Sequence, residues 1–393
     1  MTGSPTWTVT LPASGGTLDT FTVAGASPFP LVHAGEFPRV VYAAAHVVAD
    51  PLAMDRPWQA PVLDWDATLA FRRHLWGLGF AIAEAMDTSQ RGMGLDWSVA
   101  KELIARSLAE ARTVPGAALA CGAGTDQLDP VQARGVDDVI RAYEEQMEHV
   151  EAHGGRIILM ASRALCRVAK GRDEYLAVYG RLIAQAKDKV ILHWLGDMFD
   201  PQLAGYWGSM DVDQAMATCL SLIDRHAGKI DGIKISLLER AHEERMRAML
   251  PAGVKMYTGD DFNYADLIAG DGQHISHGLL GIFDPIAPAA AAALDKLAAG
   301  DLAGYHAILG PTVPLSRKIF EAPTQYYKAG IVFLAWLNGF QQHFRMVGGM
   351  ESARSLAHYA DVFRLASQAG LLVDPERAVS RMKAFLAVNG VEQ

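Results

Sequence analysis

One lysine lies inside a short apolar run, Ile230–Leu237, with the sequence Ile-Asp-Gly-Ile-Lys-Ile-Ser-Leu. Side chains alternate between the two faces of a strand, so a strand that buries Ile233 and Ile235 on one face presents Lys234 on the other. Burying a charged amine is costly unless it is paired or neutral. A neutral amine in a closed site is a nucleophile that forms a Schiff base with a carbonyl compound. The plain alternative is a strand-end lysine whose ammonium reaches solvent.

Polar residues also follow the other apolar runs of the chain. They are His46, Glu84, Asp87, Thr88, Ser89, Asp126, Ser162, Arg163, His193, Thr258, Asp260, Asp261, Ser276 and His277, with Gly259 between two of them. Ser89, Asp126 and Asp261 suit the capping of helix N-termini, but capping does not require a lysine, histidines and an arginine as well. A divalent metal ion could take ligands from His46, Asp126 and His277, although their spacing forms no local metal-binding motif.

Eight short apolar runs predict strands, and helical patterns separate most of them. The runs are Val40–Val47, Phe80–Met86, Ala117–Cys121, Arg156–Ala161, Val190–Leu195, Ile230–Ile235, Val254–Thr258 and Ile275–Leu280. Alternation of strands and helices predicts a parallel sheet. Eight such units in ~240 residues favour a (β/α)8 TIM barrel over an open sheet. In that fold the active site lies at the carboxyl ends of the strands, where the polar residues above would converge.

The sequence outside the barrel predicts an arm and an extension. Trp7–Leu11 and Leu18–Val23 flank a Ser-Gly-Gly turn and predict a hairpin. We therefore divide the chain into a hairpin and linker (1–38), a barrel (39–300) and a helical extension (301–393). The helix predicted over Tyr326–Asn338 is apolar on more than one face and should be buried, on the barrel's outer helices, as a lid or against a second copy. We favour a homo-oligomer, a symmetric dimer, because Trp and Tyr are enriched at such contacts.

Composition and charge restrict the classes of protein to which the chain can belong. Its net charge of -9 argues against nucleic acid as the main partner. We find no uncharged apolar run of about 18 residues and no secretory signal at the start, so we expect no membrane partner and a cytoplasmic location. The three cysteines, Cys121, Cys166 and Cys219, form no CxxC pair, which predicts free thiols rather than disulfides or a zinc site.

Four blocks, in their order and spacing over residues 39–310, resemble the dihydrodipicolinate synthase and N-acetylneuraminate lyase family. Ala120–Thr125 is similar to the Ala-Gly-x-Gly pattern at the family's third strand, and Ile191–Trp194 stands where the family has Ile-Leu-Tyr-Asn at its fifth. Gly232–Lys234 is similar to the Gly-Ile-Lys of the sixth strand, and Gly259–Asp261 to the Gly-Asp-Asp of the seventh.

This resemblance implies a (β/α)8 Schiff-base aldolase that needs no metal or organic cofactor. Lys234 would attack the carbonyl group of an oxo acid or aldehyde. His193 stands where the family has a tyrosine that relays protons, and histidine can do acid–base work near neutral pH. The family's Thr-Thr-Gly-Glu-like turn, which holds a substrate carboxylate, is replaced by Asp87–Gly92. There Thr88 and Ser89 could hold an anion, while Glu84 and Asp87 add negative charge.

The sequence therefore predicts a lyase of the aldolase type whose partner is a small-molecule carbonyl substrate. The predicted catalytic residues are Lys234 and His193. The predicted substrate-binding residues are Thr88, Ser89, Asp126, Arg163, Gly259, Asp260 and His277. Two alternatives stay open: a metal-dependent barrel enzyme that uses His46, Asp126 and His277, and a barrel that binds a small ligand without catalysis.

Overall fold

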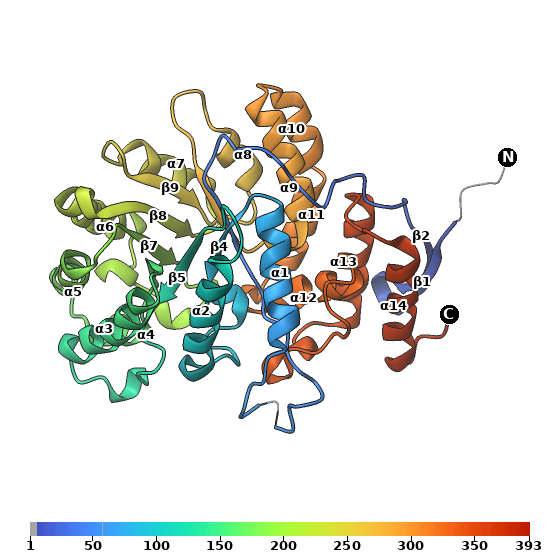
Figure 1. Ribbon diagram of the computed structural model, residues 1–393, viewed down its shortest axis with the longest axis horizontal. Coiled ribbons are helices and arrows are strands. Elements are labelled where there is room, and N and C mark those ends of the chain that lie inside the picture. Colours follow the sequence, from blue (N-terminus) through green and yellow to red (C-terminus); the bar gives the residue numbers. More distant parts are fainter. Residues whose placement is uncertain (1–5, 57) are drawn as a thin grey trace.

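The centre of the molecule is a closed barrel of eight parallel strands (Figure 1). The computed structural model describes residues 6–56 and 58–393. The barrel strands are β3 (Val41–Ala44), β4 (Ala81–Glu84), β5 (Leu119–Ala123), β6 (Arg156–Leu159), β7 (Val190–Leu195), β8 (Ile230–Ser236), β9 (Lys255–Thr258) and β10 (His277–Leu280). Each strand pairs with the next along the chain, and β10 closes the ring on β3. Every strand overlaps one predicted run, so the predicted TIM barrel is confirmed.

Helices between the strands surround the barrel (Figure 1). They are α1 (Trp65–Gly77), α2 (Trp97–Ala111), α3 (Val136–Ala152), α4 (Arg163–Val168), α5 (Arg172–Gln185), α6 (Val212–His226), α7 (Arg240–Ala248), α8 (Tyr264–Ala269) and α9 (Phe283–Ala298). Aspartates cap several of them: Asp64 accepts a hydrogen bond from the backbone of Ala67, and Asp96 from that of Val99. Such caps satisfy backbone N–H groups that a helix start leaves without partners.

Side chains fill the inside of the barrel, so it is a core and not a pore. The strands alternate, sending one set of residues outward to the helices and the other inward. The inward apolar set is Tyr42, Ala44, Ala83, Ala120, Ile158, Ile191, Tyr257 and Leu279. The space left for a ligand is therefore above this layer, at the carboxyl ends of the strands.

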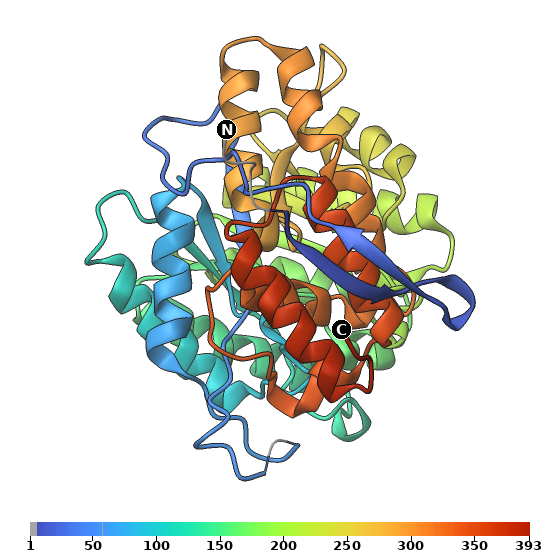
Figure 2. The same ribbon diagram turned by 90° about the vertical axis from the view of Figure 1, so that its right-hand side faces the viewer.

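The hairpin and the C-terminal helices pack on each other at one side of the barrel. The hairpin strands are β1 (Thr8–Pro12) and β2 (Leu18–Thr22), and the helices are α10 (Leu302–Leu309), α11 (Thr312–Ile319), α12 (Lys328–Leu337), α13 (Leu356–Gln368) and α14 (Pro375–Val388). Figure 2 shows the hairpin lying across the helices at the end of the chain. Val9 and Leu11 are buried there, and Asp19 pairs with Arg364. The predicted hairpin arm thus covers the helical extension.

Helix α12 is buried within a single chain, which removes the reason for predicting an interface on it. All of its residues are buried. The ring of Trp336 stacks on Phe344 with centroids 5.8 Å apart, and Phe385 and Arg381 also contact it. Because the extension itself covers these apolar faces, the helix does not need a second copy. The homo-oligomer stays a prediction without support from this helix. None of the helices in the described ranges combines the length and apolarity that a membrane crossing needs.

Candidate active site

Lys234 lies on the inner face of β8, close to its carboxyl end. Its neighbours Ile233 and Ile235 point outward into the core beneath the helices, as the alternation predicts. The lysine is only 7% exposed, and no hydrogen bond or ion pair to its amine is found in the described part of the chain. Burial lowers the pKa of Lys234 below the ordinary lysine value, while the carboxylates of Asp87 and Asp261 act against that shift. The amine is thus buried, unpaired and easier to deprotonate than a surface lysine.

His193 stands beside Lys234 on the neighbouring strand. The two residues are register partners in the pairing of β7 with β8, so their side chains project to the same inner face. Both ring nitrogens are buried, and neither has a hydrogen-bond partner among residues 6–56 and 58–393. Burial, and then the charge of Lys234, lower the pKa of His193 well below its ordinary value. Both effects favour the neutral imidazole, and its unprotonated ring nitrogen is left without a hydrogen-bond donor in the described ranges.

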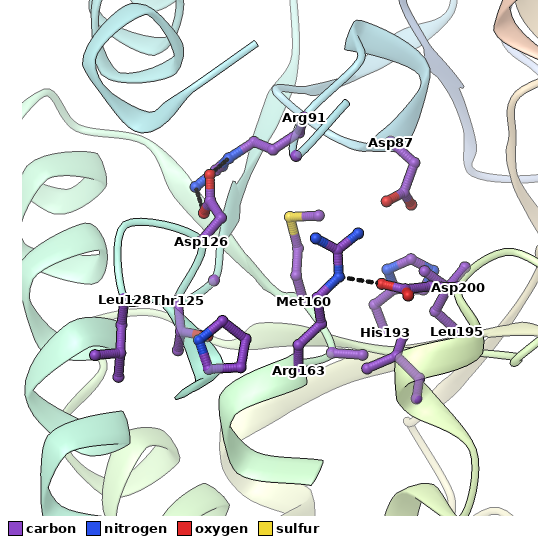
Figure 3. Close-up of a pocket in the computed structure, with 15 residues that line it drawn as sticks. Asp87, Arg91, Thr125, Asp126, Leu128, Met160, Arg163, His193, Leu195 and Asp200 are labelled. Carbon is purple, nitrogen blue, oxygen red and sulfur yellow. Dashed lines mark hydrogen bonds and ion pairs between the residues drawn. The ribbon is translucent and has the colours of Figure 1, made fainter. Parts of the chain in front are cut away.

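A cavity of about 90 Å³ opens next to His193. Its wall includes Asp87, Asp126, Arg163 and Asp200 (Figure 3). Arg163 is the first residue of α4, and its Nε donates to Asp200. Its two terminal nitrogens make no hydrogen bond to any residue that the structure describes. Arg163, a predicted substrate-binding residue, thus lines the cavity with donors still unused.

The turn after β4 holds Asp87, Thr88 and Ser89 in a short 3-10 helix. Ala85 and Gln90, on either side of it, have φ of 53° and 66°, in the left-handed region that non-glycine residues rarely adopt. Ser89 Oγ donates to the carbonyl of Met86 at 2.7 Å, so its proton is already used. Thr88 Oγ1 lies 2.8 Å from the hydroxyl of Tyr327. Of the predicted anion-binding pair, Ser89 is engaged by the backbone, whereas Thr88 contacts the hydroxyl group of another side chain, Tyr327.

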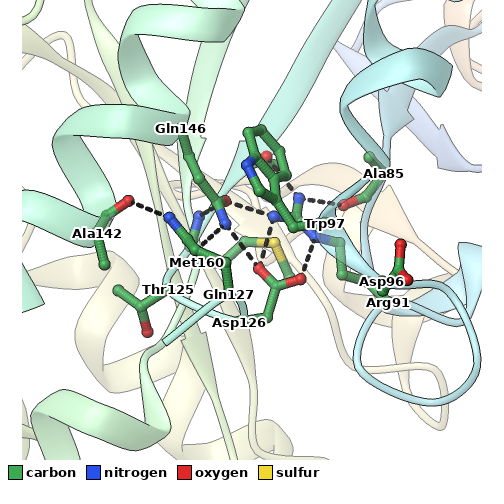
Figure 4. Close-up of polar contacts among 12 residues, drawn as sticks. Ala85, Arg91, Asp96, Trp97, Thr125, Asp126, Gln127, Ala142, Gln146 and Met160 are labelled. Carbon is green, nitrogen blue, oxygen red and sulfur yellow. Dashed lines mark hydrogen bonds and ion pairs between the residues drawn. The ribbon is translucent and has the colours of Figure 1, made fainter. Parts of the chain in front are cut away.

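Asp126 is held by Arg91 rather than left free for a ligand. Arg91 donates from Nε to Oδ2 at 3.0 Å and from Nη2 to Oδ1 at 2.7 Å (Figure 4). Gln146 adds a third hydrogen bond to Oδ1 at 2.9 Å. These donors outweigh burial and lower the pKa of Asp126, even though burial is the largest single effect. Asp126 lines the cavity as part of a rigid ion pair, and sequence reasoning missed Arg91 because its partner is distant in sequence.

Of the three residues after β9, two face the lysine. A Cβ at Gly259 would lie 2.7 Å from Lys234 Cε and 2.2 Å from Ser236 Oγ. Asp261 accepts a hydrogen bond from the backbone of Ile282 at 2.9 Å, and burial raises its pKa to about 7. Asp260 instead closes its own loop, with Oδ1 accepting from the backbones of Phe262 and Asn263. The charge of Lys234 therefore acts on Asp261, whereas Asp260, the predicted substrate-binding residue, is engaged within its own loop.

The structure corrects two other expectations, the placement of His277 and the free charge of Glu84. His277 begins β10 instead of following it, and its Nδ1 accepts a hydrogen bond from the backbone of Val40 at 2.9 Å, at the amino end of the barrel. Glu84 pairs with Arg72 of α1 through two hydrogen bonds of 2.9 Å, and both side chains are fully buried. The negative charge expected from Glu84 near the site is therefore neutralised.

The metal-binding alternative loses its ligand set. His46 Nδ1 is 2.8 Å from Asp284, Asp126 is paired with Arg91, and His277 lies at the opposite end of the barrel. In the described part of the chain, no group of three His, Cys, Asp or Glu side chains is arranged to hold a metal ion.

The C-terminal extension brings two residues to the barrel that sequence reasoning did not place there. Tyr327, which contacts Thr88, is buried and stacks on Phe320 with ring centroids 4.3 Å apart. Lys328 follows it as the first residue of α12 and is also buried. Burial is the largest effect on Lys328 and lowers its pKa to about 8. The carboxylates of Asp87 and Asp200 raise this pKa, and the cations Arg163 and Lys234 lower it. A buried lysine beginning an apolar helix was a signal in the sequence, but nothing local linked it to the barrel.

Comparisons with known proteins agree with this fold. A family model described as "Protein of unknown function (DUF993)" matches residues 9–391. No curated protein matches the chain in sequence. The chain is similar to the crystal structure of dihydrodipicolinate synthase from Aquifex aeolicus, with a TM-score of 0.63, 11% identity, and coverage of 85% of this chain and 99% of that one.

Two further solved structures show the same likeness. The chloride-inhibited dihydrodipicolinate synthase from Acinetobacter baumannii, complexed with pyruvate, has a TM-score of 0.60 and 13% identity, over 85% of this chain and 99% of that one. The dihydrodipicolinate synthase from Bacillus clausii has a TM-score of 0.60 and 14% identity, over 84% and 96%. At these identities the likeness establishes the barrel fold.

Proposed function

Because this chain belongs to the DUF993 family and has the barrel fold of the dihydrodipicolinate synthase structures, we propose that it is a lyase of the class I aldolase type. Its substrate is a 2-oxo acid or an aldehyde, bound as a Schiff base on Lys234. One observation carries the proposal: a buried, unpaired lysine amine stands in register with a neutral, unpaired histidine at the carboxyl end of the barrel.

The first step joins the substrate to the enzyme. The neutral amine of Lys234 adds to the carbonyl carbon, and the proton that it loses passes to the former carbonyl oxygen. A second proton, taken from solvent, joins this hydroxyl group, which then leaves as water, and a protonated imine remains. Holding the carbonyl group against an amine fixed on a strand supplies the proximity that a reaction in solution lacks.

The second step breaks a bond next to the imine. When the carbon–carbon bond beyond the α-carbon cleaves, its electron pair moves toward the imine nitrogen and leaves an enamine. His193 takes the proton from the hydroxyl group of the departing fragment, which leaves as a carbonyl compound. Return of the proton to the enamine and hydrolysis of the imine restore Lys234. Condensation is the same path in reverse.

Borohydride trapping tests the Schiff base directly. The protein is incubated with pyruvate, other 2-oxo acids and short aldehydes, reduced with borohydride, and its intact mass is measured. We expect one adduct, mapped to the peptide that contains Lys234. The adduct should disappear in Lys234→Met and persist in Lys101→Met, a control at an exposed lysine on α2.

Absence of an adduct with every probe, or an adduct that survives in Lys234→Met, would refute the proposal. In that case the barrel that binds a small ligand without catalysis would be the better reading. His193→Phe separates the two steps: trapping should persist, while turnover falls by about 10²-fold or more, the usual worth of a positioned acid–base group.

A further inference from the structure

Lys328 is a buried cation without a partner carboxylate. It is 5% exposed. Its Nζ donates to the carbonyl of Gln325 at 3.0 Å and to the sulfur of Met93 at 3.5 Å, and lies 4.5 Å from the centre of the Tyr327 ring. A buried ammonium in an ordinary core is paired with a carboxylate, because its desolvation is costly. No carboxylate lies within ion-pair distance of Lys328 in the ranges that the structure describes.

Lys328 and Arg163 lie against adjacent residues of one loop. A Cβ at Gly92 would lie 3.6 Å from Arg163 Nη1, and the next residue, Met93, accepts from Lys328. The repulsion of Arg163 on Lys328 agrees with this closeness. The Arg163 guanidinium donates one hydrogen bond, from Nε to Asp200, and its terminal nitrogens lie at the wall of the cavity. Arg163 thus borders the cavity beside His193, and Lys328 lies against the loop residue next to Gly92, which lines that cavity; both cations keep donors without a partner in the described ranges.

We propose that Lys328 and Arg163 form an anion subsite that binds a carboxylate or phosphate group of the substrate, remote from the carbonyl carbon that Lys234 attacks. An oxyanion with several acceptor atoms can be shared between a guanidinium fork and an ammonium point charge. The substrate class is then an oxo compound with a second, anionic end. The assignment of this anion to the substrate of Lys234 rests on the proposed function, whereas the subsite itself does not.

Direct binding tests the subsite without any chemistry at Lys234. Inorganic phosphate and acetate are titrated separately by calorimetry into the wild type, Lys328→Met, Lys328→Arg and Lys234→Met. We expect at least one anion to bind the wild type and Lys234→Met alike, and to bind Lys328→Met about tenfold or more weakly, the usual worth of a hydrogen bond to a charged group. Lys328→Arg should restore part of the loss. Lys383→Met, on α14, is the control lysine.

Trapping then shows whether the anion belongs to the substrate. Glyceraldehyde 3-phosphate is compared with glyceraldehyde, and succinic semialdehyde with butanal. The charged member of one pair should be trapped faster in the wild type, and the ratio within that pair should fall in Lys328→Met. If the ratio falls for the glyceraldehyde pair, the subsite binds a phosphate; if it falls for the succinic semialdehyde pair, the subsite binds a carboxylate.

Equal anion binding by folded Lys328→Met and wild type, or no binding of either anion to the wild type, would overturn the proposal. If Lys328→Met does not fold, Arg163→Gln takes its place, with the same expected loss and the same refutation. Anion binding that depends on Lys328, together with no adduct in the wild type, would support the subsite and reject the Schiff base.

Discussion

Substituting Gly259 by alanine should displace the amine of Lys234. A Cβ at Gly259 would meet Lys234 Cε at 2.7 Å, Ile235 O at 2.7 Å and Ser236 Oγ at 2.2 Å. Ordinary carbon–carbon contact lies at about 3.5 Å, so the end of the lysine must shift by roughly 0.8 Å. The serine hydroxyl can rotate away, but the carbonyl of Ile235 is fixed because it accepts a hydrogen bond from the backbone of Gly259.

Two consequences follow from this displacement. Overpacking of this kind costs about 1–3 kcal/mol of folding stability. A misplacement close to 1 Å costs on the order of 10²-fold in the rate of a positioned reaction. We therefore expect Gly259→Ala to fold, to unfold at a somewhat lower denaturant concentration, and to form the borohydride-reducible adduct about 10²-fold more slowly.

The assay is the rate of adduct formation by intact mass, with urea unfolding followed by circular dichroism on the same samples. Gly228→Ala is the matched control, because a Cβ there meets no atom within 4 Å and Gly228 precedes the strand that carries Lys234. If Gly259→Ala traps substrate as fast as Gly228→Ala, the amine is not held against Gly259 and the argument fails.

Three further results are expected. The rate of trapping should rise with pH around a midpoint below 10.5, because only the neutral amine attacks and burial lowers the pKa of Lys234. Asp87→Asn should lower that midpoint further, because the Asp87 carboxylate raises the pKa of Lys234. A midpoint at 10.5 or above would contradict the burial of the amine. Glu84→Ala should cost about 3–5 kcal/mol in urea unfolding, because it leaves a buried charge on Arg72 without its partner, whereas Glu102→Ala, at an exposed pair, should cost less than about 1 kcal/mol. Trp336→Glu should lower the melting temperature strongly, since the ring is packed inside one chain; an unchanged melting temperature would place the ring at a surface.

The barrel itself could be read from the sequence because its signals are local. Each strand is a short apolar run bounded by polar residues, and the helical patterns between the runs leave a parallel closed sheet as the simplest arrangement. The inner position of Lys234 also follows from alternation along one strand, since Ile233 and Ile235 must face the helices. The position of His193 beside Lys234 then follows from the register in which the neighbouring strand pairs.

The roles of the other polar residues depended on contacts between distant segments, which leave no pattern in the sequence. Asp126 and Glu84 are engaged by Arg91 and Arg72, and Asp260 by its own loop, so none of the three is free for a ligand.

The position of His277 turned on where a strand begins, a boundary that an apolar run does not define to within two residues. Tyr327 and Lys328 reach the site because the C-terminal helices fold back onto the barrel. The sequence by itself determined the barrel and the amine at its mouth, since both are set by side-chain periodicity. Only the tertiary structure decided which charges surround that amine, because each charge is assigned by a partner far away in the chain.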